Sequence, residues 1–128
     1  IENAVIEMWH AHPTPIEAQE LKRTDGVDYD MQTREFRYYG QFSTGADGRY
    51  SVVTKKPGWY LNGPNFRPSH IHVRVYVGRV ERLTTQLYFS GDPFISEDPW
   101  ASAAPERVVV LHRNAQGHAS GQFTFVVS

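Results

Sequence analysis

The sequence predicts an all-β protein, an antiparallel β-sandwich with long active-site loops, and three observations lead to this prediction. Short segments alternate apolar and polar residues and are rich in β-branched and aromatic types. Turn signals, of which Asp47-Gly48 is the strongest, separate several of these segments. No segment shows a long helical periodicity, and no internal repeat is present. Six or seven short strands in one chain are typical of a sandwich.

Length, charge and cysteine content narrow the class of protein further. With 128 residues, 40% of them hydrophobic, residues 1–128 are expected to form one domain with a real core. The formal net charge is -1 with acids and bases interspersed, which argues against nucleic-acid binding. No apolar run is long enough to span a membrane. Because there is no cysteine, a metal site would have to use nitrogen and oxygen ligands.

The first half of the chain predicts one strand, a long loop and a hairpin. Residues 4–10, "AVIEMWH", alternate as a strand does. Residues 11–30 are polar and interrupted by prolines, so a long loop is expected there. Residues 36–44 and 49–54 flank the turn "GADG" and are expected to pair as a β-hairpin.

The second half predicts irregular stretches at residues 55–68 and 94–106, both rich in proline. Between and after them the alternation returns, and the turn sequence "NAQG" separates the last two segments. The strands expected in this half are residues 70–77, 82–89, 107–113 and 122–127.

The strand at residues 70–77, "HIHVRVYV", has one apolar face and one polar face. His70, His72, Arg74 and Tyr76 share the polar face, because side chains alternate along a strand. Two interpretations are open at this point. The polar face is simply solvated, as in many antiparallel sheets, or both imidazoles bind one metal ion.

Tyr60, in "PGWY", lies ten residues before His70, and a tyrosine ligand would favour Fe(III) as the metal ion. Deprotonating a tyrosine, whose reference pKa is about 10, needs a strongly charged hard cation, and Fe(III) suits phenolate oxygen combined with imidazole. A cupin-like zinc or Fe(II) site would instead need a glutamate soon after His72, and none follows it.

Several stretches, in order along residues 4–95, resemble the intradiol ring-cleavage dioxygenases, the family of catechol 1,2-, hydroxyquinol 1,2- and protocatechuate 3,4-dioxygenases. The similar stretches are "AVIEMWHAH", "DGVDYDMQ", "ADGRYSVVTKKPGWY", "RPSHIH" and "LTTQLYFSGDP". The resemblance implies an enzyme that uses a mononuclear non-haem Fe(III) and O2. It inserts both oxygen atoms into a catechol-type diol and cleaves the ring between the hydroxylated carbons, giving a cis,cis-muconate-type diacid.

The same resemblance implies the residues of the site. Arg67 corresponds to the active-site arginine of the family and Gln86 to a glutamine that lines the pocket, while Tyr60 corresponds to the tyrosine that leaves the iron when substrate binds and accepts a proton. The implied iron ligands are Tyr29, Tyr60, His70 and His72.

Other tyrosines and histidines that could compete as metal ligands are expected to have structural roles. Tyr38 and Tyr39 lie in a strand-like run where aromatic residues normally pack. His10 and His12 repeat the histidine spacing but lack a tyrosine at a comparable distance, so they are expected to be structural or rim residues. The alternative for the whole chain is a transthyretin-like β-sandwich that binds a ligand or partner without catalysis.

The expected partners are a catechol-type molecule and O2, with no nucleic acid and no membrane. The identity of the catechol, and whether the chain forms a homo-oligomer, stay open. So does the compartment: the cytoplasm is slightly favoured, and a secreted form stays possible because the sequence begins at Ile1 without a methionine.

Overall fold

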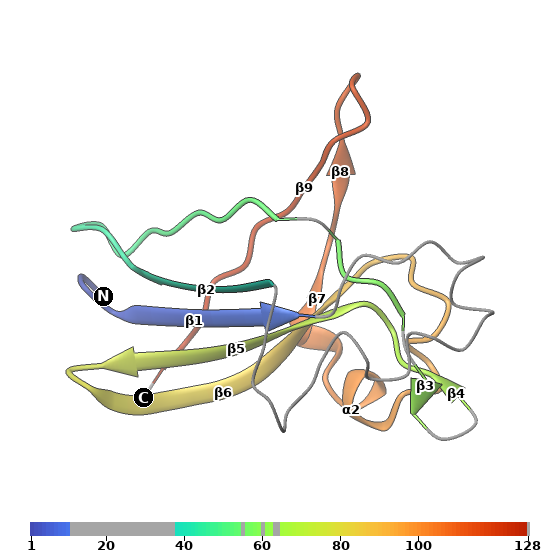
Figure 1. Ribbon diagram of the computed structural model, residues 1–128, viewed down its shortest axis with the longest axis horizontal. Helices are drawn as coiled ribbons and strands as arrows, with labels where there is room; N and C mark the ends of the chain where they lie inside the picture. Colours follow the sequence, from blue (N-terminus) through green and yellow to red (C-terminus); the bar gives the residue numbers. More distant parts are fainter. Residues whose placement is uncertain (11–37, 55, 60, 63–64, 128) are drawn as a thin grey trace.

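A computed structural model describes residues 1–10, 38–54, 56–59, 61–62 and 65–127 of the chain (Figure 1). Strands dominate, and the helices are one turn each. In chain order the elements are β1 (Val5–His10), β2 (Tyr38–Ser43), β3 (Leu61–Asn62), β4 (Asn65–Phe66), β5 (His70–Val77), β6 (Val80–Phe89), α2 (Pro99–Ser102), the 3-10 helix η1 (Pro105–Arg107), β7 (Val108–Val109), β8 (His112–Arg113) and β9 (Ala119–Ser120).

The main sheet has five strands in the order β2-β1-β5-β6-β7. The β2-β1, β1-β5 and β5-β6 pairs are antiparallel, and only the short β6-β7 pair is parallel. A tight turn at Gly78 and Arg79 joins β5 to β6, and both residues have positive φ, as two-residue hairpin turns require. Both termini lie at this end of the sheet, whereas β3, β4 and α2 gather at the other (Figure 1).

The register of the sheet separates an apolar face from a polar one. Ile6 lies opposite Val75, and Ile71 lies opposite Leu87, on the face that forms the core. On the other face Trp9, His72 and Gln86 form one row across three strands. The alternation predicted for β5 is therefore present in the structure.

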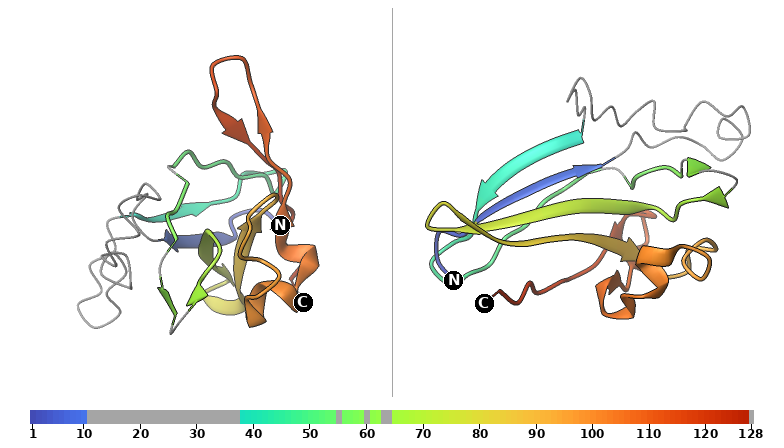
Figure 2. Two further views of the ribbon diagram at one scale, coloured as in Figure 1. Left: turned by 90° about the vertical axis from the view of Figure 1, so that its right-hand side faces the viewer. Right: turned by 90° about the horizontal axis from the view of Figure 1, so that it is seen from below.

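The second layer of the sandwich consists of extended chain that covers the apolar face. From these covering segments Tyr50, Phe123, Phe125 and Val127 pack against the core, and Figure 2 shows the C-terminal segment running alongside the sheet. The Tyr50 hydroxyl donates a hydrogen bond to the Phe123 carbonyl (2.7 Å), so the two covering segments are tied to each other.

The all-β sandwich prediction is confirmed, but two predicted strands are not. Residues 49–54 and 121–127 carry no strand in the structure, although the "GADG" turn between β2 and the first of them does form. Phe123, Phe125 and Val127 of the second segment pack against the core, but of the first segment Tyr50 packs there while Val52 and Val53 are exposed. A strand also needs a backbone partner at a sheet edge, and alternation of residue types does not show whether one exists.

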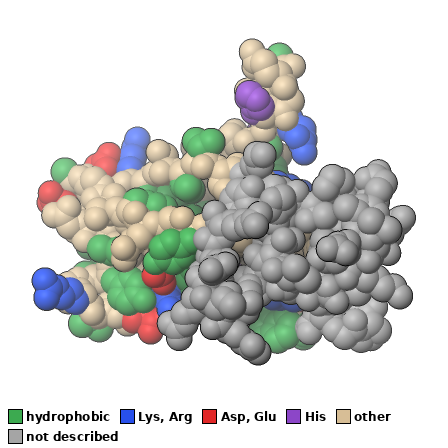
Figure 3. Space-filling model, in the orientation of Figure 1, with side chains coloured by type: hydrophobic (Ala, Val, Ile, Leu, Met, Phe, Trp, Pro, Cys, Tyr) green, Lys and Arg blue, Asp and Glu red, His purple; other side chains and the backbone are tan. Residues whose placement is uncertain are grey.

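The segment predicted as one strand at residues 107–113 is divided between η1, β7 and β8. The β8-β9 hairpin then projects from the body of the protein, with histidine and basic side chains on it (Figure 3). Among the described residues, no helix is long and apolar enough to cross a membrane.

Candidate metal centre

The two histidines of β5 lie side by side at the end of the sheet near α2. His70 begins the strand opposite Tyr88, and His72 lies opposite Gln86. Their ring centroids are 5.0 Å apart and their planes are inclined by 72°. The HxH spacing therefore places two imidazoles next to each other on the polar face, as two ligands of one ion would have to be.

The hydrogen bonds of His70 determine which of its nitrogens carries the proton. Nδ1 lies 2.7 Å from the carbonyl oxygen of Pro68, which only accepts, and Nε2 lies 3.2 Å from Nη1 of Arg67, which only donates. Nδ1 is therefore protonated, and the Nε2 lone pair faces Nη1 of Arg67. A backbone carbonyl commonly orients metal-binding histidines in this way.

Both imidazoles are neutral at physiological pH. Burial, with smaller contributions from Arg67 and His72, lowers the pKa of His70 to about 3. Burial, together with Arg67 and Arg74, lowers the pKa of His72 to about 4. A metal ligand must offer an unprotonated nitrogen, so both groups are in the form that an ion needs.

His72 is held on its other side by a stack of flat groups. The ring of Trp9 lies parallel to it, with centroids 5.1 Å apart and planes within 5°. The guanidinium of Arg74 lies over the Trp9 ring at 4.9 Å, and Glu7 pairs with Arg74 at 3.6 Å. The orientation of His72 therefore depends on β1 as well as on β5.

Arg67 connects the histidines to the rest of the site. Its side chain is only 7% exposed and forms an ion pair with Asp98 at 2.8 Å. Nη2 donates to Oε1 of Gln86 at 2.9 Å, and the same oxygen accepts from the Tyr88 hydroxyl at 3.1 Å. A permanently charged group is thus fixed beside His70 in an environment with little water.

A turn after β6 ties down the chain that leads to Tyr60. Asp92 accepts hydrogen bonds from the Trp59 indole (3.0 Å), the Ser69 amide (2.9 Å) and the Phe94 amide (2.9 Å). The Trp59 and Phe94 rings also meet edge to face, 4.8 Å between centroids. Residue 59 is therefore anchored to the same turn as the start of β5.

Comparison with known proteins decides the family. A family model described as "Dioxygenase" matches residues 1–127. The protocatechuate 3,4-dioxygenase beta chain of Burkholderia cepacia is 35% identical over 134 residues, covering 94% of this chain and 54% of that protein. The chain belongs to the intradiol ring-cleavage dioxygenase family.

Two further relatives agree with this assignment. Chlorocatechol 1,2-dioxygenase of Cupriavidus pinatubonensis is 30% identical over 112 residues, 77% of this chain and 40% of that protein. The solved dioxygenase domain of a dioxygenase carbohydrate-binding protein fusion from Streptomyces sp. SirexAA-E is 34% identical, with a TM-score of 0.73, and the match covers 99% of this chain and 69% of that one. This intradiol dioxygenase chain spans about half the length of the curated relatives it matches.

The structure brings together four of the six residues that the sequence analysis assigned to the site, namely Arg67, His70, His72 and Gln86. The remaining two, Tyr29 and Tyr60, lie outside the described residues and stay predictions. In the part of the chain that the structure describes, no three His, Cys, Asp or Glu side chains gather for a metal. The histidine pair offers two nitrogen ligands, and the ligand set implied by the resemblance needs Tyr29 and Tyr60 in addition.

The competing candidates take structural positions in this intradiol dioxygenase chain. The Tyr39 hydroxyl donates to Glu7, and this bond, with burial, raises the tyrosine pKa to about 12, which disfavours a phenolate. His10 lies in the row of Ile71, on the opposite face from His72, and its Nε2 is 2.8 Å from the Thr54 hydroxyl. His12 lies outside the described residues.

Sequence reasoning missed Asp98 and Trp100. Asp98 pairs with Arg67 across 31 positions of sequence, a distance that no local pattern bridges. A signal was present in "SEDPW", because an Asp followed by Pro marks the first turn of a helix. That signal predicts a helix start, and only the fold reveals that the same carboxylate also holds the arginine.

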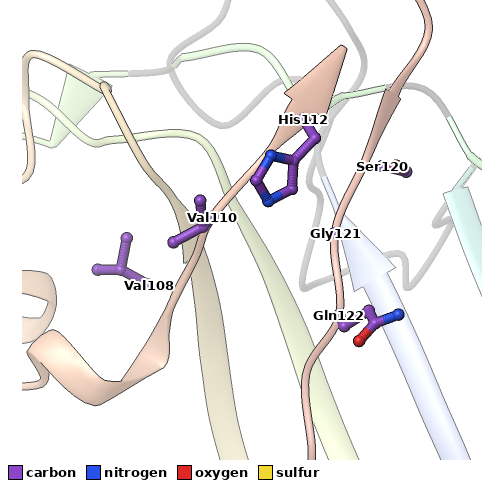
Figure 4. A pocket seen from close by; sticks show the side chains of 6 residues that line it. All are labelled: Val108, Val110, His112, Ser120, Gly121 and Gln122. Atoms are coloured by element: carbon purple, nitrogen blue, oxygen red, sulfur yellow. The ribbon is translucent and has the colours of Figure 1, made fainter. Parts of the chain in front are cut away.

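A separate hollow of about 520 Å³ lies between the β7-β8 segment and the C-terminal segment (Figure 4). Its lining residues are Val108, Val110, His112, Ser120, Gly121 and Gln122. Neither histidine of β5 lines it.

Proposed function

We propose that this chain carries the active site of a non-haem Fe(III) intradiol dioxygenase that cleaves a catechol-type diol with O2, giving a cis,cis-muconate-type diacid. The observation that carries the proposal is a pair of neutral imidazoles on β5, His70 buried and His72 half-buried, with a cationic Arg67 fixed beside them. Membership of the intradiol family supports the reaction class. The relatives named above act on protocatechuate or chlorocatechol according to their names, which supports a catechol-type substrate here.

His70, His72, Tyr29 and Tyr60 would hold the iron, through two imidazole nitrogens and two phenolate oxygens. The ion, when bound, would chelate the diol and make its ring reactive toward O2. Two phenolates and a hydroxide balance a trivalent charge, so the site would not bury net charge.

The protein's own groups would carry the remaining steps. Tyr60 would accept one proton of the incoming diol at its phenolate oxygen, and the hydroxide would take the other and leave as water, so the site would stay neutral with the substrate dianion. Arg67 would stabilise the negative charge that develops on the ring, because its cation is already fixed in a site with little water. Gln86 would orient Arg67 through the bond to Nη2.

A visible absorption spectrum of the purified protein, with iron quantified, tests the proposal directly. Tyrosinate bound to Fe(III) gives a red charge-transfer band. We expect about one iron per chain, because His70 and His72 together would serve one ion. Anaerobic addition of catechol is expected to shift the band to longer wavelength, and O2 is then expected to bleach it with formation of the diacid. A protein that stays colourless after reconstitution with iron would favour a non-catalytic binding module instead.

A further inference from the structure

Asp98, on the loop between β6 and α2, holds Arg67 by two parallel hydrogen bonds. Nε donates to Oδ1 at 2.8 Å and Nη2 donates to Oδ2 at 3.0 Å. The Asp98 side chain is only 2% exposed. Two bonds between a planar guanidinium and a planar carboxylate fix direction as well as distance.

The carboxylate of Asp98 is itself fixed by the helix that it begins. Oδ2 accepts a hydrogen bond from the Ala101 amide at 2.8 Å, and Pro99 occupies the first turn. Trp100, in the same turn, lies against the face of the Arg67 guanidinium at 4.6 Å. The first turn of α2 therefore contacts both the Nε edge and the flat face of the Arg67 guanidinium.

We propose that Asp98 is the positioning residue that aims Arg67 at the metal and substrate, with Trp100 as a second positioning contact. Asp98 occupies the Nε and Nη2 edge of the guanidinium, which leaves Nη1 directed at Nε2 of His70. The negative charge of Asp98 also compensates the buried cation. This inference rests on the proposed function, and it adds a residue outside β5 and β6 to the machinery.

The substitution Asp98→Asn separates positioning from helix capping. Asparagine caps a helix about as well as aspartate, so α2 should persist, but the charged pair with Arg67 is lost. Arg67 acts on charge that develops during the reaction, and a small displacement can cost about 100-fold. We expect kcat for catechol to fall by about 100-fold with iron content retained and KM changed by less than about threefold.

A double-mutant cycle identifies the route of this effect. If Asp98 acts through Arg67, adding Asp98→Asn to Arg67→Met should cause no further loss of kcat, because the arginine that it positions is gone. The double variant also leaves no unpaired charge buried. Losses that multiply in the double variant, or an Asp98→Asn enzyme within about twofold of the parent, would overturn the proposal.

Two further variants test whether the loss of kcat comes from unfolding or from the loss of any carboxylate charge. Trp100→Leu removes the stacked ring and leaves the Asp98 pair and the cap in place, and a smaller loss of kcat is expected, with KM and iron retained. Asp47→Asn is the matched control, because Asp47 also pairs with an arginine, Arg49 at 3.6 Å, but both are exposed. This control should keep the parental kcat.

A measurement without turnover keeps this inference separate from the proposed function. In the metal-free protein, the Arg67 Nε proton should exchange with water about tenfold faster in Asp98→Asn than in the parent. Equal exchange rates would show that Asp98 does not hold the arginine, even in an active enzyme. If the parent binds no iron and cleaves no catechol, the proposed function fails. The exchange rate still shows whether Asp98 holds Arg67.

Discussion

The two faces of the five-stranded sheet are organised by different interactions. The apolar face is buried under extended segments that contribute mainly side-chain area, from residues such as Phe123 and Phe125. The polar face near α2 depends on discrete bonds, and the guanidinium of Arg67 alone contacts Asp98, Gln86, His70 and Trp100. A packed apolar surface tolerates small displacements of its side chains, whereas a set of directed hydrogen bonds does not. Substitutions on the first face should therefore change stability, and those on the second should change chemistry.

The largest effect on stability is expected for Ile6→Ala. Ile6 is 2% exposed and lies in the centre of the core. Loss of its side chain should lower the free energy of unfolding by about 2–5 kcal/mol, measured by urea denaturation. The variant that remains folded should keep its iron and its visible band. Val53→Ala, at a residue that is 99% exposed, is the control and should change the free energy of unfolding by less than about 0.5 kcal/mol.

On the polar face, Arg67→Lys should have the opposite profile. Lysine keeps the positive charge but has no planar fork to satisfy Asp98 and Gln86 together. We expect kcat to fall by about 10² to 10³, equivalent to about 2.7–4 kcal/mol of transition-state stabilisation, with the visible band preserved. Steady-state oxygen uptake measures this. Parental activity in Arg67→Lys, as expected for the exposed control Arg49→Lys, would remove Arg67 from the chemistry.

A smaller loss of stability is expected for Gly121→Ala, where the covering segment passes close to β7. A Cβ at residue 121 would lie 2.5 Å from Cγ1 of Val109 and 3.0 Å from the carbonyl oxygen of Val110. The C-terminal segment would have to move, at a cost of about 1–3 kcal/mol in thermal or urea unfolding. Gly40→Ala is the control, because a Cβ there has open space. A Gly121→Ala protein as stable as the parent would mean that the C-terminal segment does not lie this close to β7.

The smallest effect is expected for Tyr50→Phe, and it depends on pH. Removing the hydrogen bond to Phe123 should cost about 1 kcal/mol at neutral pH. Burial raises the Tyr50 pKa from 10.0 to about 12, so the folded protein retains a proton that the unfolded chain releases above pH 10. The parent should therefore lose stability as the pH rises from about 10 toward 12, and Tyr50→Phe should lack this contribution. Parallel stability curves for the two proteins across this range would contradict the assignment.

Much of the polar face could be predicted from sequence because its key residues share one strand. The two-residue period of β5 places His70 and His72 together whatever the rest of the fold does. Arg67 and Gln86 were implied by the family resemblance, through one motif just before this strand and one on the strand paired with it. Tyr29 and Tyr60 stay predictions, because they lie outside the described residues.

The parts that could not be predicted depend on contacts between distant segments. Residues 122–127 turn alternate side chains toward the core, whereas in residues 49–54 Tyr50 packs there and the other side chains are exposed, and neither segment is a strand in the structure. Asp98 shows a helix-start signal, but its partner Arg67 is brought to it only by the packing of the loop after β6. A local sequence pattern predicts which residues are buried or cap a helix. Which distant residue each of them contacts depends on the whole fold.

The central position of β5 bears on how long the site survives between unfolding events. β1 pairs with one edge of this strand and β6 with the other, so its backbone amides are protected on both sides. Such strands typically exchange their amide hydrogens only when the domain opens globally, while edges and loops open far more often. The segment that carries His70 and His72 should thus be among the slowest-exchanging in the protein. His70 and His72 would then keep their spacing while edges and loops of the protein open.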